Sequence, residues 1–158
     1  MDHHGQSGQG KHNPYLALLL MAALSFLAMY VLMYAMVDRL GNVYPNVNQF
    51  YMAGLMAAPM VLIELVLMRG MYPRRRWNAA VALASVALGA AFFLGIRMQA
   101  AVTDAQFLKS MIPHHAGAIL MCERAALDDP ELRELCARII AGQQAEIDWM
   151  KAKLDERR

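Results

Sequence analysis

Three long apolar stretches constrain the fold of this chain more than any other feature of its sequence. They cover residues 15–37, 50–68 and 79–96, and the first carries no charged side chain. A helix of about 20 apolar residues crosses the hydrocarbon core of a bilayer, so each stretch can span it once. Hydrophobic residues make up 58% of the chain and charged residues 18%, which excludes an ordinary soluble domain. We predict an all-α protein whose residues 15–96 form a three-span transmembrane region.

The arginines between the second and third stretches predict the orientation of the chain. Residues 69–77 contain four arginines, whereas the loop before residue 50 offers only Arg39. Because cytoplasmic loops of membrane proteins are enriched in Lys and Arg, we expect the arginine-rich loop in the cytoplasm. Three spans then place residues 97–158 outside a bacterial inner membrane, in the periplasm or outside the cell, and the N-terminus in the cytoplasm. The net charge of +2 is explained by these arginines and gives no argument for a nucleic-acid partner.

The N-terminal segment, residues 1–14, is rich in Gly, Gln, Ser and His and is predicted to form a mobile tail. Its first three residues offer an amine, amides and an imidazole to Cu(II). A formylated amine would spoil this site and a reducing cytoplasm disfavours Cu(II), so we expect a solvated tail. The apolar stretch that follows is too long for a signal peptide and is expected to remain as an anchor.

Residues 97–158 are predicted to form a helical hairpin. Thr103 with Gln106 three residues later is a capping-box pattern for a first helix. Asp129 and Pro130 open a second helix, because Asp is a good N-cap and Pro fits the first helical position. Whether the third span continues unbroken into the first helix is left open. An antiparallel pair that turns near Asp129 sets Cys122 opposite Cys136, either as a disulfide or as two buried thiols.

The segment from Met111 to His115 brings a thioether and two adjacent imidazoles together, and Met121 follows. Imidazole with thioether suits copper, Cu(I) above all. The spacing of three and four residues predicts the face of the first helix that packs in the hairpin, namely Phe107, Met111, His114, Ala118, Met121 and Ala125. The corresponding stripe on the second helix is Cys136, Ile140, Gln143, Ile147, Met150 and Leu154, with Glu146 beside it.

The hairpin pairing sets the polar groups of both helices at one level. It places His115 near Gln143, His114 near Gln144, and Met150 near Phe107 or Leu108. Burying such groups without partners costs about 1–3 kcal/mol each. The cluster is therefore expected to be hydrogen-bonded, filled by a metal, or open to water.

The pattern Asp104-x-x-Phe107-x-x-x-Met111-Ile112-Pro113-His114-His115, with Gln143-x-x-Glu146-Ile147-x-x-Met150, resembles a bacterial family, domain of unknown function three hundred and five. The resemblance covers roughly residues 98–157 and extends to membrane-attached members of that family. It implies a ferritin-like helical bundle and copper handling linked to copper resistance. Carried over to this chain, it implies the ligands Met111, His114, His115, Met121 and Met150, with Asp104, Gln143 and Glu146 in supporting positions. One hairpin is half of a four-helix bundle, so a homo-oligomer is expected.

The second apolar stretch carries a further pattern. Met52, Met56, Met60 and Glu64 recur every four residues and so trace one stripe of a helix, a candidate path for metal through the membrane. Small-residue pairs, Gly54 with Ala58 and Ser85 with Gly89, are predicted to let the second and third helices approach closely.

We expect a membrane-anchored copper-binding protein that captures, buffers or passes on copper, with Cu(I) favoured and Cu(II) open. No nucleophile constellation predicts catalysis, so an enzyme is not expected. A copper-delivery protein is a candidate partner besides the lipid bilayer. Two alternatives remain. One is a component of a metal transporter or channel that uses the stripe containing Glu64, and the other is a structural membrane oligomer without metal.

Overall fold

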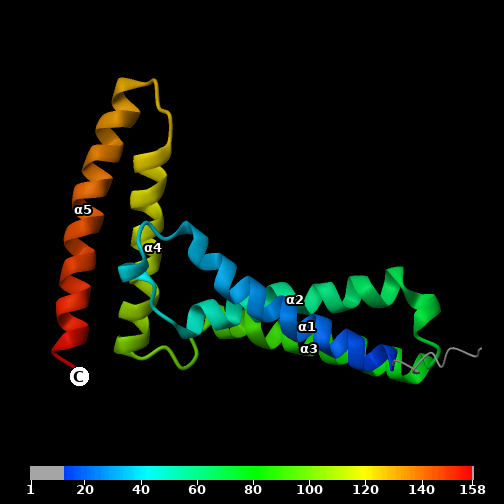
Figure 1. Ribbon diagram of the computed structural model, residues 1–158. Helices are drawn as coiled ribbons and strands as arrows, with labels where there is room; N and C mark the ends of the chain where they lie inside the picture. The colour runs from blue at the N-terminus through cyan, green and yellow to red at the C-terminus, as the bar shows by residue number, and fades with distance from the viewer. Residues whose placement is uncertain (1–12, 158) are drawn as a thin grey trace, which may run out of the picture.

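The computed structural model describes residues 13–157, so most of the predicted tail lies outside the described residues. All regular structure among the described residues is helical, as predicted (Figure 1). Three helices form one arm of the molecule and two form a hairpin. Their bounds are α1 Pro14–Leu32, α2 Val47–Leu67, α3 Arg75–Arg97, α4 Asp104–Arg124 and α5 Pro130–Asp155, with short 3₁₀ turns η1 Met33–Met36, η2 Leu40–Asn42 and η3 Arg69–Met71.

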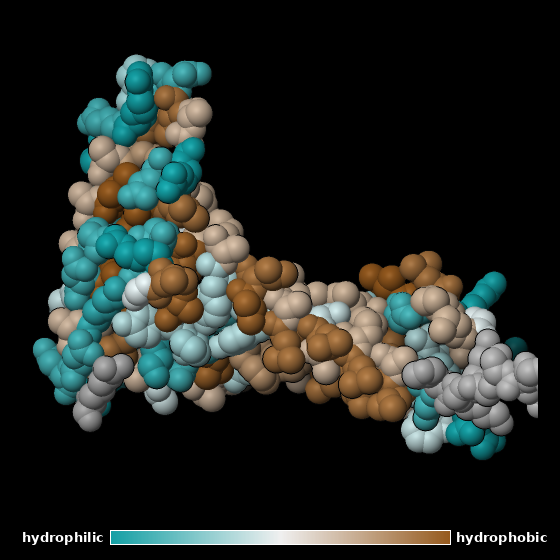
Figure 2. All heavy atoms as spheres, in the orientation of Figure 1, coloured by the Kyte–Doolittle hydropathy of each residue, from teal (hydrophilic) through white to brown (hydrophobic). Residues whose placement is uncertain are grey.

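The first arm contains three helices that are long and apolar enough to cross a membrane, at Pro14–Met36, Val47–Leu67 and Arg75–Arg97. The second and third begin three or four residues before the predicted stretches, because polar residues form their first turns. For α2 this start is capped by Asn46, whose side chain accepts a hydrogen bond of 2.9 Å from the Gln49 amide. Figure 2 shows apolar side chains along most of the visible length of this arm and hydrophilic ones at its far end, as expected for a surface that faces lipid.

Within the first arm, α2 packs against both α1 and α3. Small residues bring α2 and α3 close together, as predicted. A Cβ atom added to Gly89 would lie 3.4 Å from the Cβ of Ala58, and one added to Gly54 would clash with the ring of Phe92. The close α2–α3 contact therefore depends on glycine at residue 54, whereas a Cβ at residue 89 would make an ordinary van der Waals contact.

The chain breaks between α3 and α4, so the third span does not continue into the hairpin. Helix α3 ends at Arg97, and Gln99 and Ala101 have positive φ angles of 49° and 57°. Non-glycine residues adopt this left-handed conformation rarely, so the turn is fixed by contacts around it. The hairpin consequently lies across the end of the span bundle, at the opposite end from η3 and the arginine-rich loop (Figure 1).

The ends of the hairpin helices follow the predicted capping residues. The Thr103 side chain accepts from the Gln106 amide at 3.4 Å, and the Asp129 carboxylate accepts from the Glu131 amide at 2.8 Å. Gln106 does not complete a capping box, however. Its side-chain oxygen accepts from the amide of Val47 at 3.0 Å and so caps the first turn of α2 instead.

The predicted packing face of the first hairpin helix is wrong by about one residue. Phe107 and Met121 are 50% and 58% exposed, and His114 is exposed as well. The buried side chains of α4 come from the neighbouring stripe and form one core with α5, namely Leu108, Ile112, Ala116 and Ile119 with Ile147, Met150 and Leu154. The predicted α5 stripe was correct in its C-terminal half, since Ile147, Met150 and Leu154 are all buried.

The connecting segment, residues 37–46, explains this shift because it covers one side of the hairpin. Val37 and Tyr44 pack against the hairpin core. The guanidinium of Arg39 donates to the side-chain oxygen of Gln144 at 2.7 Å. A Cβ added to Gly117 would lie 3.4 Å from the carbonyl oxygen of Met36, so the chain just before this segment lies close to α4. Helix α4 thus turns one stripe toward α5 and the connecting segment together.

Candidate metal site in the helical hairpin

His115 is the centre of the polar cluster in the hairpin. Its residue is 8% exposed, and both ring nitrogens face oxygen acceptors. Nδ1 lies 2.9 Å from the carbonyl oxygen of Met111, one turn earlier on α4. Nε2 lies 2.6 Å from Oε2 of Glu146 on α5. The nearest predicted partner, Gln143, is one turn away along α5 and is half-buried.

This arrangement restricts the chemistry of the imidazole. A neutral ring has one N–H donor and one acceptor, so it cannot donate to both oxygens. When Nδ1 donates to the Met111 carbonyl, Nε2 is left as an acceptor, and a proton or a metal cation between Nε2 and the carboxylate completes the contact. The side chain of Glu146 is 61% exposed, so water and ions reach this contact from outside.

Two methionines lie next to this pair. Met150 is buried in the hairpin core, and Met111 is half-buried and packs against the same core. Along the helices, Met111 lies about one turn before His115, and Met150 lies about one turn after Glu146. The structure therefore brings Glu146 of the supporting set into contact with His115 and places two further predicted ligands, Met111 and Met150, in the hairpin core about one turn away.

The remaining predicted site residues lie elsewhere. The ring of His114 is exposed, with its centroid 6.0 Å from that of His115, and Met121 is on the surface nearly two turns further along α4. Asp104 pairs with Arg157 at 2.9 Å at the open end of the hairpin. Gln144, expected near His114, bonds to Arg39 and Asp148 instead. Among residues 13–157, no three His, Cys, Asp or Glu side chains gather as a metal site.

The structure joins Cys122 and Cys136 in a disulfide, the first of the two alternatives that the sequence left open. The bridge connects the end of α4 to the beginning of α5, near the tip of the hairpin. It fixes which residues of the two helices lie side by side.

The stripe of methionines on α2 lies at the surface of the first arm. Met52 and Met56 are exposed, and Met60 and Glu64 are half-buried. The Glu64 carboxylate accepts a hydrogen bond of 3.3 Å from the hydroxyl of Tyr72. Burial, together with the nearby Glu64 carboxylate, raises the pKa of Tyr72, so the tyrosine remains a donor. In a single copy, Met52 and Met56 thus lie on the outer surface of α2 rather than between the three helices.

Comparison with known proteins identifies a family and a relative that matches most of this chain. Residues 93–154, which include the whole polar cluster, match the family described as "Domain of unknown function (DUF305)". An uncharacterized protein of Acanthamoeba polyphaga mimivirus is 33% identical over 144 residues, which cover 89% of this chain and 93% of the viral protein. That likeness extends beyond the hairpin into the apolar helices. No solved structure matches the chain.

Proposed function

This chain belongs to the DUF305 family, and on that premise we propose that it is a membrane-anchored copper-binding protein that captures, buffers or passes on copper. The hairpin carries the copper, and the three apolar helices anchor it in the cytoplasmic membrane. The arginine-rich loop at the far end of the span bundle supports a hairpin on the outer side of that membrane.

The observation that carries this proposal is the position of His115. Metal-ligating histidines almost always donate their second ring N–H to a carbonyl or carboxylate, which fixes the ring and its tautomer. Here Nδ1 can donate to the Met111 carbonyl, which leaves the lone pair of Nε2 pointing at the Glu146 carboxylate. An imidazole nitrogen and a carboxylate oxygen suit Cu(II), and the adjacent Met111 and Met150 thioethers suit Cu(I).

The proposed role is binding without turnover, and a copper-delivery protein is its natural partner. A solvent-accessible carboxylate at the edge of the site lets the ion enter and leave without unfolding the hairpin. The transporter alternative has no comparable contact in its favour, because the exposed Met52 and Met56 do not line a passage within one copy.

Metal titrations of the protein, of two site variants and of one control variant test the proposal. Copper, silver as a Cu(I) mimic, and zinc are titrated into the purified full-length protein. Glu146→Gln and His115→Ala are expected to lose copper affinity at least tenfold, as loss of a ligand does. Glu134→Gln removes another exposed carboxylate of α5, one that pairs only with Arg138, and is expected to bind like the unchanged protein. No copper binding would leave the structural oligomer without metal as the better account, and equal binding by all variants would exclude His115 and Glu146 as the copper site.

A further inference from the structure

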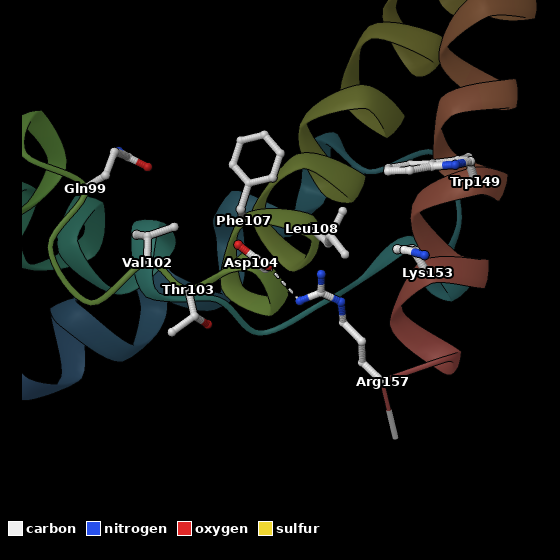
Figure 3. A pocket seen from close by; sticks show the side chains of 9 residues that line it. All are labelled: Gln99, Val102, Thr103, Asp104, Phe107, Leu108, Trp149, Lys153 and Arg157. Atoms are coloured by element: carbon white, nitrogen blue, oxygen red, sulfur yellow. Dashed lines mark hydrogen bonds and ion pairs between the residues drawn. The ribbon is translucent and has the colours of Figure 1, made fainter.

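An open hollow lies on the side of the hairpin away from the connecting segment. It has a volume of about 470 Å³ and lies between the α3–α4 turn, the beginning of α4 and the end of α5 (Figure 3). Phe107 and Trp149 line it, although they are 50% and 62% exposed. Lys153 and the ion pair of Asp104 with Arg157 lie at its margin. Two large exposed aromatic side chains beside one hollow are typical of an interaction surface.

The same side of α5 also carries a side chain that could fill such a hollow. Leu135 is 43% exposed and lies near the tip, two heptads before Trp149 and therefore on the same stripe of the helix. Gly142 lies midway between them, and a Cβ atom added there would meet nothing within 4 Å. The stripe thus has an apolar side chain at one end, a hollow at the other and no side chain in the middle. We call the side of the hairpin that carries Leu135, Gly142 and Trp149 the open face.

Helix α4 also has a small residue at this middle point. The disulfide and the contact of His115 with Glu146 fix the level of α4 against α5. At this level Ala118 lies beside Gly142, on the stripe of α4 that includes Phe107. Both helices of the hairpin therefore allow close approach at the centre of the open face.

We propose that the open face binds the open face of a second copy of this chain in the same bilayer. The two α5 helices run antiparallel and cross at Gly142, about a two-fold axis perpendicular to the membrane. A two-fold contact uses the same patch on both partners, so Leu135 of each copy enters the hollow beside Trp149 of the other. Because each hairpin lies across the end of its spans (Figure 1), neighbouring copies in one membrane present these faces side by side.

The charges beside the open face favour this antiparallel arrangement. Glu146 and Arg138 are equidistant from Gly142 along α5, and so are Lys153 and Glu131. The two-fold rotation therefore sets each carboxylate opposite a cation of the second copy. A parallel arrangement would instead set each of these groups opposite its own like charge, which is unfavourable. Within one copy, Arg138 pairs with Glu134 and Lys153 with Glu156. Both pairs are exposed, and such pairs are weak and easily exchanged. Glu146 also contacts His115 through one carboxylate oxygen, Oε2.

The same two-fold rotation brings a residue of the second copy to the level of the proposed copper site. This step rests on the proposed function. Met121 and His115 are equidistant from Ala118 along α4. Met121 of the second copy thus lies level with His115 of the first, although within one chain the two are nearly two turns apart. A second copy therefore adds a third thioether, at the level of His115, to those of Met111 and Met150 in one hairpin.

Site-directed cross-linking tests the interface in the full-length protein in nanodiscs, with a chelator present so that no metal is bound. Gly142→Cys places a thiol at the axis, and its control Ala141→Cys places one on the adjacent exposed residue, which points away from the open face. The native cysteines are already joined to each other. A short bis-maleimide is expected to give a covalent dimer at least tenfold more efficiently at residue 142. Equal yields, or no dimer at either position, would overturn the proposal.

Tryptophan fluorescence gives a second measurement that leaves Gly142 unchanged. In a Trp77→Phe background, Trp149 is the only tryptophan, and the dimer is expected to shield it from iodide. Leu135→Glu is expected to restore quenching and yield monomers, whereas Ala141→Glu is not. Shielding of Trp149 in a protein that stays monomeric in lipid would identify lipid as the occupant and refute the interface. Metal-free dimers that bind no copper would refute the proposed function and leave the interface standing.

Discussion

At the scale of single residues, the most informative side chain is one that faces more hydrogen-bond acceptors than its neutral form has protons to donate. His115 is such a residue, because both of its ring nitrogens face oxygens. The sequence predicted the imidazole pair, yet it could not tell which of the two enters the hairpin. Adjacent residues on a helix point about 100° apart, and the packing of α4 against both α5 and the connecting segment decides that His115 is buried and His114 is not.

Asp38 offers a prediction about pH at the same scale. Burial raises the pKa of its carboxyl group, but hydrogen bonds from Arg39 and Asn42 outweigh burial and hold the pKa below its ordinary value of 3.8. A lowered pKa in the folded state stabilises the fold above the ordinary value, and this contribution is lost as the pH falls through the lowered value. The connecting segment is therefore expected to loosen from the hairpin below about pH 4.

Hydrogen exchange of the connecting segment between pH 5 and pH 2.5, corrected for intrinsic rates, measures this effect. Asp38→Asn is expected to remove the acid-dependent increase in opening, while the unchanged protein shows it. An identical pH dependence in both proteins would show that another group controls the segment.

At the scale of elements, the sequence predicted helix positions well and helix faces less well. The spans and both hairpin helices follow from apolar length and from capping residues such as Thr103 and Asp129. The face of α4 was wrong because α4 carries two neighbouring apolar stripes, one with Phe107 and one with Leu108. Periodicity cannot choose between them, since the choice depends on Val37 and Tyr44 from a loop far away in the sequence.

The disulfide at the hairpin tip gives a prediction at this scale. It closes a loop with a sequence separation of 14 residues, for which the chain-entropy model gives a stabilisation of about 3 kcal/mol. The double variant Cys122→Ser with Cys136→Ser is expected to unfold its hairpin more easily by roughly 2–4 kcal/mol. Circular dichroism during urea unfolding measures this loss. Reducing agent should destabilise the unchanged protein similarly and leave the double variant unaffected.

At the scale of the whole molecule, the hairpin and the span bundle form one unit. The α3–α4 turn alone would leave the hairpin free to swing, but polar contacts from α2 hold the base of α4. Gln106 accepts from the Val47 amide at 3.0 Å, and the Asn48 side chain donates to Ser110 at 3.0 Å. No sequence pattern predicted these contacts, because each joins residues about 60 positions apart.

The orientation of the whole molecule can be tested by labelling from one side of the membrane. Arg76→Cys in the arginine-rich loop and Lys151→Cys on the hairpin are introduced separately. A membrane-impermeant maleimide added to intact cells is expected to label residue 151 and not residue 76, because arginine-rich loops stay in the cytoplasm. Both should react after the cells are opened. Labelling of residue 76 in intact cells would reverse the predicted topology.

The sharp turn at Gln99 and Ala101 determines how far the hairpin extends from the lipid. A straight continuation of α3 would hold the tip of α4 about 30 Å above the bilayer, at 1.5 Å per residue. The turn instead lays the hairpin along the end of the span bundle (Figure 1). Under the proposed function, a bound copper ion would therefore stay in a thin layer next to the membrane, where a receiver anchored in the same bilayer would be found by a two-dimensional search.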